Sequence, residues 1–110
     1  MGGGFYRIDY VGRADSGSGA IAIVNGQIAG LDITGGEYRG SYQEVGGRIR
    51  GDVTLTAKAP AALVTGRMLR GGETVPIALD IPAESLDGAE FPISVAGGTV
   101  RLRLTKIAEL

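Results

Sequence analysis

The sequence predicts an all-β protein, a small up-and-down antiparallel β-barrel of about eight strands. Turn-forming residue pairs recur at short, regular intervals along the 110 residues, which is typical of sandwiches and barrels. Between the turns, apolar and polar residues alternate with a period of two, as Ile49, Val53 and Leu55 do with Arg50 and Thr54. Such alternation indicates an antiparallel sheet with one buried face. Hairpin order in a short chain favours the barrel, and a two-sheet sandwich is the alternative.

The turn pairs delimit the strands, because Asn-Gly and Gly-Gly supply the positive φ that tight hairpins need. They are Asn25-Gly26, Gly35-Gly36, Gly46-Gly47, Gly71-Gly72, Asp87-Gly88 and Gly97-Gly98. The segments between them predict strands at residues 4–11, 18–24, 27–33, 37–44, 48–58, 63–70, 74–81, 89–96 and 99–107. Residues 82–86 are compatible with one helical turn. No linker separates these segments, so we expect a single β-barrel domain over residues 1–110.

Pairing the hairpins around their turns predicts which side chains share the inner face. With turn centres at 25–26, 35 and 45–46, Gly30, Gly40 and Gly51 form one level row across three neighbouring strands. The bulky residues on that face are Ile21, Ile23, Ile28, Tyr38, Tyr42, Ile49 and Val53. A row without side chains favours a bend that lets the sheet coil and close into a barrel. The alternative is that the row leaves space for a ligand.

Asp32 also falls on the inner face, opposite Tyr38. A carboxylate there needs hydrogen-bond partners or an opening to water. One interpretation is a strand-end residue bonded to backbone donors at the barrel mouth. The other is a polar anchor inside a pocket.

Composition excludes several kinds of chemistry. The chain has no Cys and no His, which removes disulfides, Cys/His zinc sites and His-based triads. We therefore expect no enzyme, no metal and no cofactor. Lys and Arg total 11 against 12 Asp and Glu, so no net positive charge attracts nucleic acid. Without a secretory signal or a bilayer-length apolar run, the sequence predicts a cytoplasmic protein that does not contact membranes.

The first half of the chain carries an ordered set of short motifs. A G-x-Y opening at residues 4–6 is followed by G-x-G at 17–19, N-G at 25–26, G-x-D at 30–32 and Y-x-G-x-Y at 38–42. This order resembles the GrlR-like family, negative regulators of type III secretion in Gram-negative bacteria. The resemblance covers roughly residues 4–58. It implies a lipocalin-like eight-stranded barrel with an apolar cavity, which forms a homodimer and binds a transcriptional activator without catalysing a reaction.

Two functions follow as hypotheses. The first is a non-enzymatic regulator that dimerises and binds a protein partner such as a transcriptional regulator. Its expected interface residues are Phe5, Leu63, Met68, Ile107 and Leu110. The second is a carrier or sensor that holds a small apolar ligand in the barrel. Its expected cavity residues are Tyr6, Tyr10, Ile21, Ile23, Asp32, Tyr38 and Tyr42.

The G-x-Y opening also resembles the G-x-W start of lipocalins, in which an Arg from the last strand covers the aromatic ring. By that resemblance, Arg101 or Arg103 covers Tyr6 through a cation–π contact.

Overall fold

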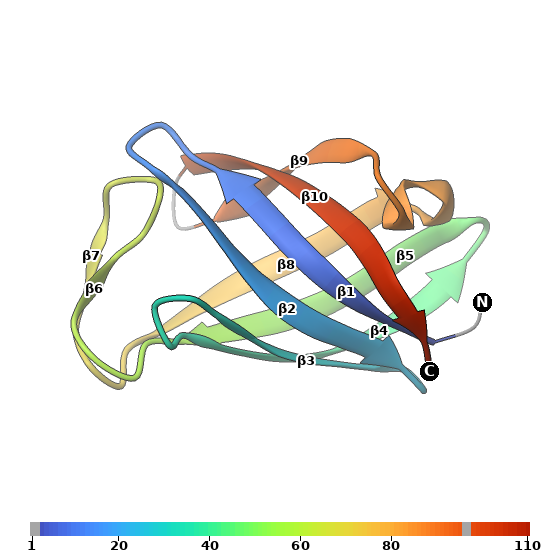
Figure 1. Ribbon diagram of the computed structural model, residues 1–110, viewed down its shortest axis with the longest axis horizontal. Coiled ribbons are helices and arrows are strands. Elements are labelled where there is room, and N and C mark those ends of the chain that lie inside the picture. Colours follow the sequence, from blue (N-terminus) through green and yellow to red (C-terminus); the bar gives the residue numbers. More distant parts are fainter. Residues whose placement is uncertain (1–2, 96–97) are drawn as a thin grey trace.

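The computed structural model describes residues 3–95 and 98–110, and eight strands in it close into an antiparallel barrel (Figure 1). The elements are β1 (Gly4–Val11), β2 (Ser16–Val24), β3 (Gln27–Asp32), β4 (Glu37–Val45), β5 (Arg48–Thr56), β6 (Ala61–Ala62), β7 (Met68–Leu69), β8 (Thr74–Pro82), the 3₁₀-helix η1 (Ala83–Leu86), β9 (Glu90–Val95) and β10 (Gly98–Glu109). Around the barrel the order is β1-β10-β9-β8-β5-β4-β3-β2. Neighbouring strands are therefore consecutive in the chain, apart from the excursion of β6 and β7 and the pairing of β1 with β10, which closes the barrel. The predicted up-and-down barrel is confirmed, and the two-sheet sandwich is not formed.

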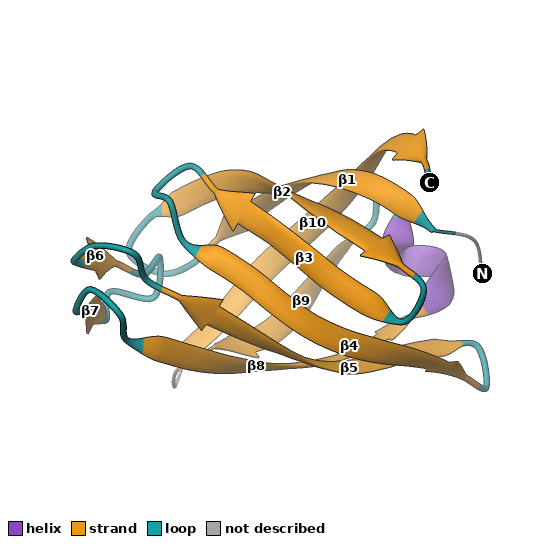
Figure 2. Ribbon diagram, turned by 90° about the horizontal axis from the view of Figure 1, so that it is seen from below, coloured by secondary structure: helices purple, strands orange, loops and turns teal. Residues whose placement is uncertain are grey.

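The predicted strand over residues 63–70 is wrong. That segment instead belongs to a hairpin of two-residue strands, β6 and β7, which pair with each other and stand outside the barrel (Figure 2). Gly66 has a φ of 96°, which an extended strand does not allow, and its N–H donates back to the Leu63 carbonyl. The adjacent apolar residues Leu63 and Val64 also break the period of two, so no single face of a strand could bury both. We call residues 57–73 the hairpin segment.

The barrel has two distinct ends. At one end lie the termini, the Asn25-Gly26 and Gly46-Gly47 turns, and η1; we call this the terminal end (Figures 1 and 2). At the other end lie the β1–β2 turn at residues 12–15, the β3–β4 turn at 33–36 and the hairpin segment; we call this the hairpin end. Among the described residues, no helix is long and apolar enough to span a membrane.

The registers correct the predicted glycine row. Gly30 lies opposite Ile21 as expected, but its partner on β4 is Tyr38 and not Gly40, and Gly51 pairs with Tyr42. Both predicted registers were off by two residues. Gly46 and Gly47 themselves form the β4–β5 turn, with positive φ at both. The three glycines remain on adjacent strands and on the inner face, since a shift of two preserves the face.

Each of these glycines instead lies against the backbone of a neighbouring strand. A Cβ at Gly30 would meet the Ala20 carbonyl oxygen, and one at Gly40 would meet the Asp52 carbonyl oxygen. A Cβ at Gly51 would likewise meet a carbonyl oxygen on β4. Such close approach is what a strongly coiled sheet needs, which supports the structural interpretation of the glycines over the one that reserved space for a ligand.

Candidate functional site

A cavity of about 160 Å³ extends into the barrel from the hairpin end. Its walls are the inward-facing residues of the strands, which alternate with exposed residues along each strand. Most of them are aliphatic, including Ile8, Ile21, Leu55, Ile77 and Leu104. The barrel core is thus incompletely filled on this side.

The hairpin segment covers the cavity and is held against the opposite rim of the barrel. The Val64 carbonyl accepts hydrogen bonds from the backbone N–H groups of Ala14 (2.8 Å) and Asp15 (3.2 Å), both in the β1–β2 turn. Gly12 lies beneath the same carbonyl, and a Cβ there would clash with it. Leu63, Val64 and residues around them line the cavity. The hairpin segment is therefore part of the cavity wall as well as its cover.

One wall of the cavity carries a polar cluster, which we call the Tyr–Asp cluster: Tyr10, Asp32 and Tyr38. Asp32 ends β3 and organises the following turn. Its Oδ1 accepts hydrogen bonds from the Thr34 N–H (3.0 Å), the Thr34 hydroxyl (2.6 Å) and the Gly36 N–H (2.9 Å). Its Oδ2 accepts the Tyr38 hydroxyl at 3.0 Å. Asp32 is thus bonded to backbone donors at the barrel mouth, and it also lines the cavity; its role as an anchor for a ligand stays a prediction.

Burial and the nearby carboxylate keep both tyrosines of this cluster neutral. Burial raises the pKa of Tyr38 far above its usual value, and Tyr10 and Asp32 add to the effect. Burial, followed by the charge of Asp32, raises the pKa of Tyr10 to about 12. Both Tyr38 and Asp32 act on the Tyr10 hydroxyl and contribute to its altered pKa. The cluster is therefore one connected set of hydroxyl groups around a carboxylate.

Thr65 adds a second polar position to the cavity lining. Its hydroxyl oxygen is buried and makes no hydrogen bond with any described residue. An unpaired buried hydroxyl costs about 1–3 kcal/mol, and a bound molecule or water relieves that cost. Thr65 was not among the predicted cavity residues, because a strand was predicted over residues 63–70 where the hairpin lies. The Leu63-Val64 pair that interrupts the alternation was the available signal.

The structure brings together most of the predicted cavity residues. Those that line the cavity are Tyr10, Ile21, Ile23, Asp32 and Tyr38. Tyr6 and Tyr42 do not line it, because they lie toward the terminal end, four residues further along β1 and β4. Whether the lining residues bind a ligand stays a prediction.

At the terminal end, a lysine from the last strand lies over the first tyrosine. Lys106 Nζ is 5.9 Å from the centre of the Tyr6 ring, at the outer limit of a cation–π contact. The prediction that Arg101 or Arg103 covers Tyr6 is wrong, because both face outward and pair with Glu90 on β9. Lys106 points inward because it continues the buried phase of Leu104.

The predicted interface residues separate into three places. Phe5, Ile107 and Leu110 are exposed at the paired ends of β1 and β10. Met68 is exposed on β7, at the other end of the molecule. Leu63 is half-buried, packs against the core and lines the cavity, so its placement on an outer surface is wrong.

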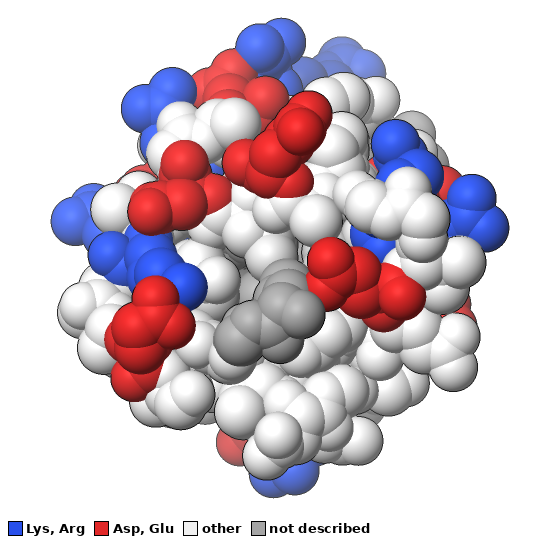
Figure 3. Space-filling model, turned by 90° about the vertical axis from the view of Figure 1, so that its right-hand side faces the viewer, with Lys and Arg blue, Asp and Glu red and all other residues white. Residues whose placement is uncertain are grey.

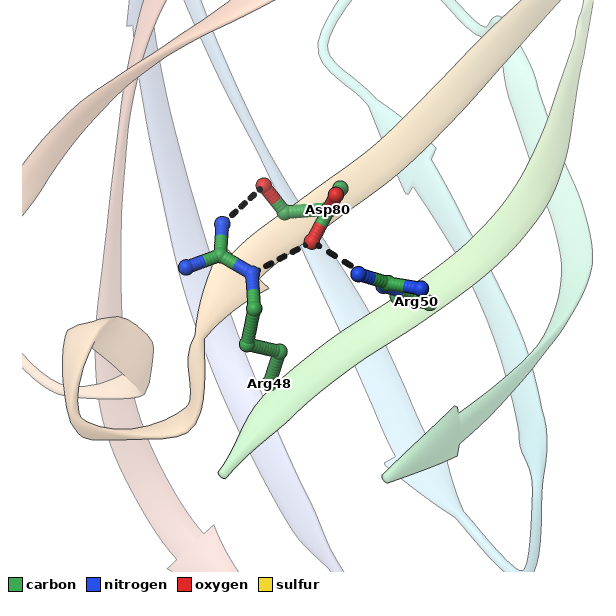
Figure 4. A network of polar contacts seen from close by, with 3 residues as sticks. All are labelled: Arg48, Arg50 and Asp80. Carbon is green, nitrogen blue, oxygen red and sulfur yellow. Dashed lines mark hydrogen bonds and ion pairs between the residues drawn. The ribbon is translucent and has the colours of Figure 1, made fainter. Parts of the chain in front are cut away.

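Basic residues on the outside are matched by acids on neighbouring strands. Arg48 and Arg50 of β5 both contact Asp80 of β8, with Arg48 Nε 2.7 Å from Oδ1 (Figure 4). The hydrogen bond from Arg48 lowers the pKa of Asp80. Figure 3 shows acidic side chains around the centre of the terminal end, with basic ones farther out. Acidic and basic side chains therefore both occur at the terminal end, and neither sign covers it alone.

The described residues include no group of three or more side chains positioned to hold a metal ion. No family model matches the chain, and no curated protein or solved structure matches it. The resemblance to the GrlR-like family therefore stays a prediction.

Proposed function

We propose that this protein binds a small, largely apolar molecule inside the barrel and serves as its carrier or sensor. The observation that carries the proposal is the 160 Å³ cavity, which has mostly aliphatic walls and a few polar side chains. Binding sites for small molecules commonly combine apolar walls with a few placed polar groups. An eight-stranded barrel is also just wide enough to enclose one small ligand.

The volume limits the ligand to roughly one ring. An engineered apolar cavity of about 150 Å³ in another protein accommodates benzene, so this cavity suits a single aromatic ring or a short branched chain. Long acyl chains and fused ring systems would need the hairpin segment to move.

Toluene tests this proposal, since it is apolar and has one ring. We expect toluene to raise the midpoint of thermal unfolding and to shift NMR signals of residues that line the cavity, such as Ile8 and Ile21. Ala57 is buried and lines the cavity, so Ala57→Leu fills part of it and should weaken toluene binding about tenfold. The control is Ala78→Leu, which adds the same atoms on the exposed face of β8.

Unchanged NMR signals up to the solubility limit of toluene would refute the proposal. Equal weakening by Ala57→Leu and Ala78→Leu would also contradict it, because toluene would then bind elsewhere. Native mass spectrometry of gently purified protein extends the test to the natural ligand. We expect a mass excess on the order of 100 Da, which is lost on denaturation, since a molecule that fills this cavity has roughly the size of benzene.

A second function is supported by a separate observation, the exposed apolar side chains Phe5, Ile107 and Leu110 at the ends of β1 and β10. Exposed apolar clusters commonly mark protein interfaces. We propose that this surface forms a homodimer or binds a protein partner such as a transcriptional regulator in the cytoplasm, with the cavity ligand modulating that contact.

Sedimentation of matched variants tests this second function. Phe5→Asp should reduce the assembled mass, whereas Val11→Asp changes an exposed residue at the other end of β1 and should not. A monomeric wild type without a co-purified protein would refute it.

A further inference from the structure

We propose that the ligand carries a hydrogen-bond-donating head group, a hydroxyl or an ammonium, which binds at the Tyr–Asp cluster, and that carboxylates are excluded. This inference rests on the proposed ligand-binding function. It follows from the count of donors and acceptors on Tyr10, Asp32 and Tyr38.

Asp32 supplies acceptors only. An ionised carboxylate has two oxygens and no proton to donate. Three donors from the β3–β4 turn already occupy Oδ1, which fixes the carboxylate in place. The remaining oxygen, Oδ2, faces the tyrosine hydroxyls and accepts the proton of Tyr38.

The tyrosines leave lone pairs, and not protons, for a ligand. Each hydroxyl has one proton, and Tyr38 donates its proton to Asp32. The Tyr10 hydroxyl lies close enough to Asp32 for that carboxylate to raise its pKa, so Asp32 is an available acceptor for the Tyr10 proton. Because a hydrogen bond to a carboxylate is stronger than one to a neutral group, we expect both protons to be directed away from the ligand. A ligand group at this wall must therefore donate.

Charge at the cavity favours the same ligands. The ionisable acids and bases that line it are Asp15, Asp32 and Lys58, two negative and one positive, with a net charge of −1. Lys58 is also paired with Glu37 at 3.2 Å, so its charge is already matched. A carboxylate ligand would meet unpaired lone pairs and a negative charge in a partly desolvated site, which is unfavourable.

Thr65 does not change this preference. Its hydroxyl is unpaired and lines the cavity, but it can donate or accept with equal ease. It therefore offers a contact to a second polar atom of the ligand without selecting its kind. The preference for a donating head group therefore comes from the Tyr–Asp cluster and from the net charge at the cavity.

Four compounds of nearly equal size test the inference: toluene, benzyl alcohol, benzylammonium and benzoate. For the wild-type protein we expect benzyl alcohol and benzylammonium to bind several-fold more tightly than toluene, as one added hydrogen bond allows. We expect benzoate to bind at least about tenfold more weakly than benzyl alcohol. Dissociation constants come from NMR titration at neutral pH and fixed salt.

The variant Asp32→Asn separates hydrogen-bond polarity from charge. The introduced amide keeps an oxygen for the turn and places a donor toward Tyr38, which reverses the bond and frees the Tyr38 proton for the ligand. We expect the ratio of benzyl alcohol to benzoate affinity to fall about tenfold. Asp15→Asn makes the same change of charge at the cavity, but Asp15 accepts its hydrogen bond from the Ser16 N–H rather than from Tyr38, so it should alter the ratio much less.

The outcomes distinguish the two proposals. If none of the four compounds binds, the ligand-binding function fails. If toluene binds but benzoate binds as tightly as benzyl alcohol, the ligand-binding function stands and the head-group inference is wrong. Equal effects of the Asp15 and Asp32 variants would also overturn the inference, since charge alone would then set the preference. Should Asp32→Asn not fold, the wild-type series still decides.

Discussion

The two ends of the barrel receive the same type of inward-facing residue, tyrosine, but they differ in the charge beside it and in whether a cavity forms. β1 carries Tyr6 and Tyr10, and β4 carries Tyr38 and Tyr42, so each end receives one inward tyrosine from each strand. Tyr6 lies beside a cation, Lys106. Tyr10 and Tyr38 surround an anion, Asp32. Only the second pair lines a cavity.

The difference comes from what closes each end. At the terminal end, η1 places Leu86 into the core and is fixed at its start by the bond from the Ala83 N–H to the Gly47 carbonyl (2.9 Å). Ile49 and Ile81 pair beside it and are 0% and 2% exposed. The hairpin end is closed in a different way. A long segment with two-residue strands crosses it, places Leu69 into the core, and bonds the β1–β2 turn through the Val64 carbonyl.

The short η1 helix thus fills the terminal end, whereas the long hairpin segment covers the hairpin end and leaves a cavity beneath it. Filling favours stability, because close packing gains dispersion contacts that a void forfeits. Covering leaves a volume that a ligand can occupy.

The largest expected effect comes from truncating the packed end. Ile81→Ala should lower the free energy of unfolding by about 4–5 kcal/mol, because the packed surroundings cannot collapse into the new void. Ile77→Ala, four residues away on the same face of β8, should cost only about 2–3 kcal/mol, since Ile77 already borders the cavity. Urea unfolding measures both. An equal or greater cost for Ile77→Ala would show that the hairpin end is packed as tightly.

Gly30, Gly40 and Gly51 let neighbouring strands of the barrel approach closely, and this effect is not specific to either end. Gly40→Ala should destabilise the protein by about 1–3 kcal/mol, because its Cβ would meet backbone atoms of Asp52 and Val53. Gly71→Ala is the control, since a Cβ there meets only ordinary contacts and φ is not positive. A neutral Gly40→Ala in the same urea experiment would contradict the close approach of β4 and β5.

Removing one hydroxyl from each end sharpens the contrast. Tyr38→Phe should cost about 1–2 kcal/mol, because it takes a donor from the Asp32 carboxylate. Tyr6→Phe should cost less than about 1 kcal/mol, since the cation–π contact uses the ring and not the hydroxyl. Thermal unfolding of both variants gives the comparison. The reverse order would mean that the Tyr–Asp cluster does not stabilise the hairpin end.

Alkaline pH should weaken the hairpin end, where two tyrosines have raised pKa values. Tyr10 and Tyr38 have pKa values raised above 10 in the folded protein, so the unfolded chain loses these protons first. Their contribution to stability is complete below pH 10 and falls as pH rises toward 12. Each tyrosine can contribute a loss of at most about 1.4 kcal/mol per pH unit, because each releases one proton. In urea unfolding between pH 9 and 12, Tyr38→Phe should show a shallower fall than wild type; an identical slope would refute this assignment.

The smallest effect on stability is expected at the cover. Gly12→Ala pushes on the Val64 carbonyl and should weaken the attachment of the hairpin segment, with a cost of about 1 kcal/mol or less. Hydrogen exchange at the Ala14 and Asp15 amides should become several-fold faster. The exchange of bound toluene with free toluene should also become faster. Unchanged protection of these two amides would show that the Val64 contact does not hold the cover.

Local patterns determined much of this protein. The period of two fixed which residues face inward, and the Asn25-Gly26 turn fixed the β2–β3 register, because both depend on residues close in the chain. The other registers were harder to predict. The Asp32 side chain bonds the Thr34 and Gly36 amides, and so shortens the β3–β4 ladder to end at Leu31 and Glu37.

The sequence by itself determined an all-β chain, its eight barrel strands and its inner face, because alternation and turn residues act over a few positions. The tertiary structure alone decided that Lys106, and not an arginine, reaches Tyr6, and that residues 57–73 cover one end without filling it. These outcomes depend on which distant side chains meet when the barrel closes, and on how much volume they leave unfilled. No short stretch of sequence determines these distant contacts or the volume that they leave unfilled.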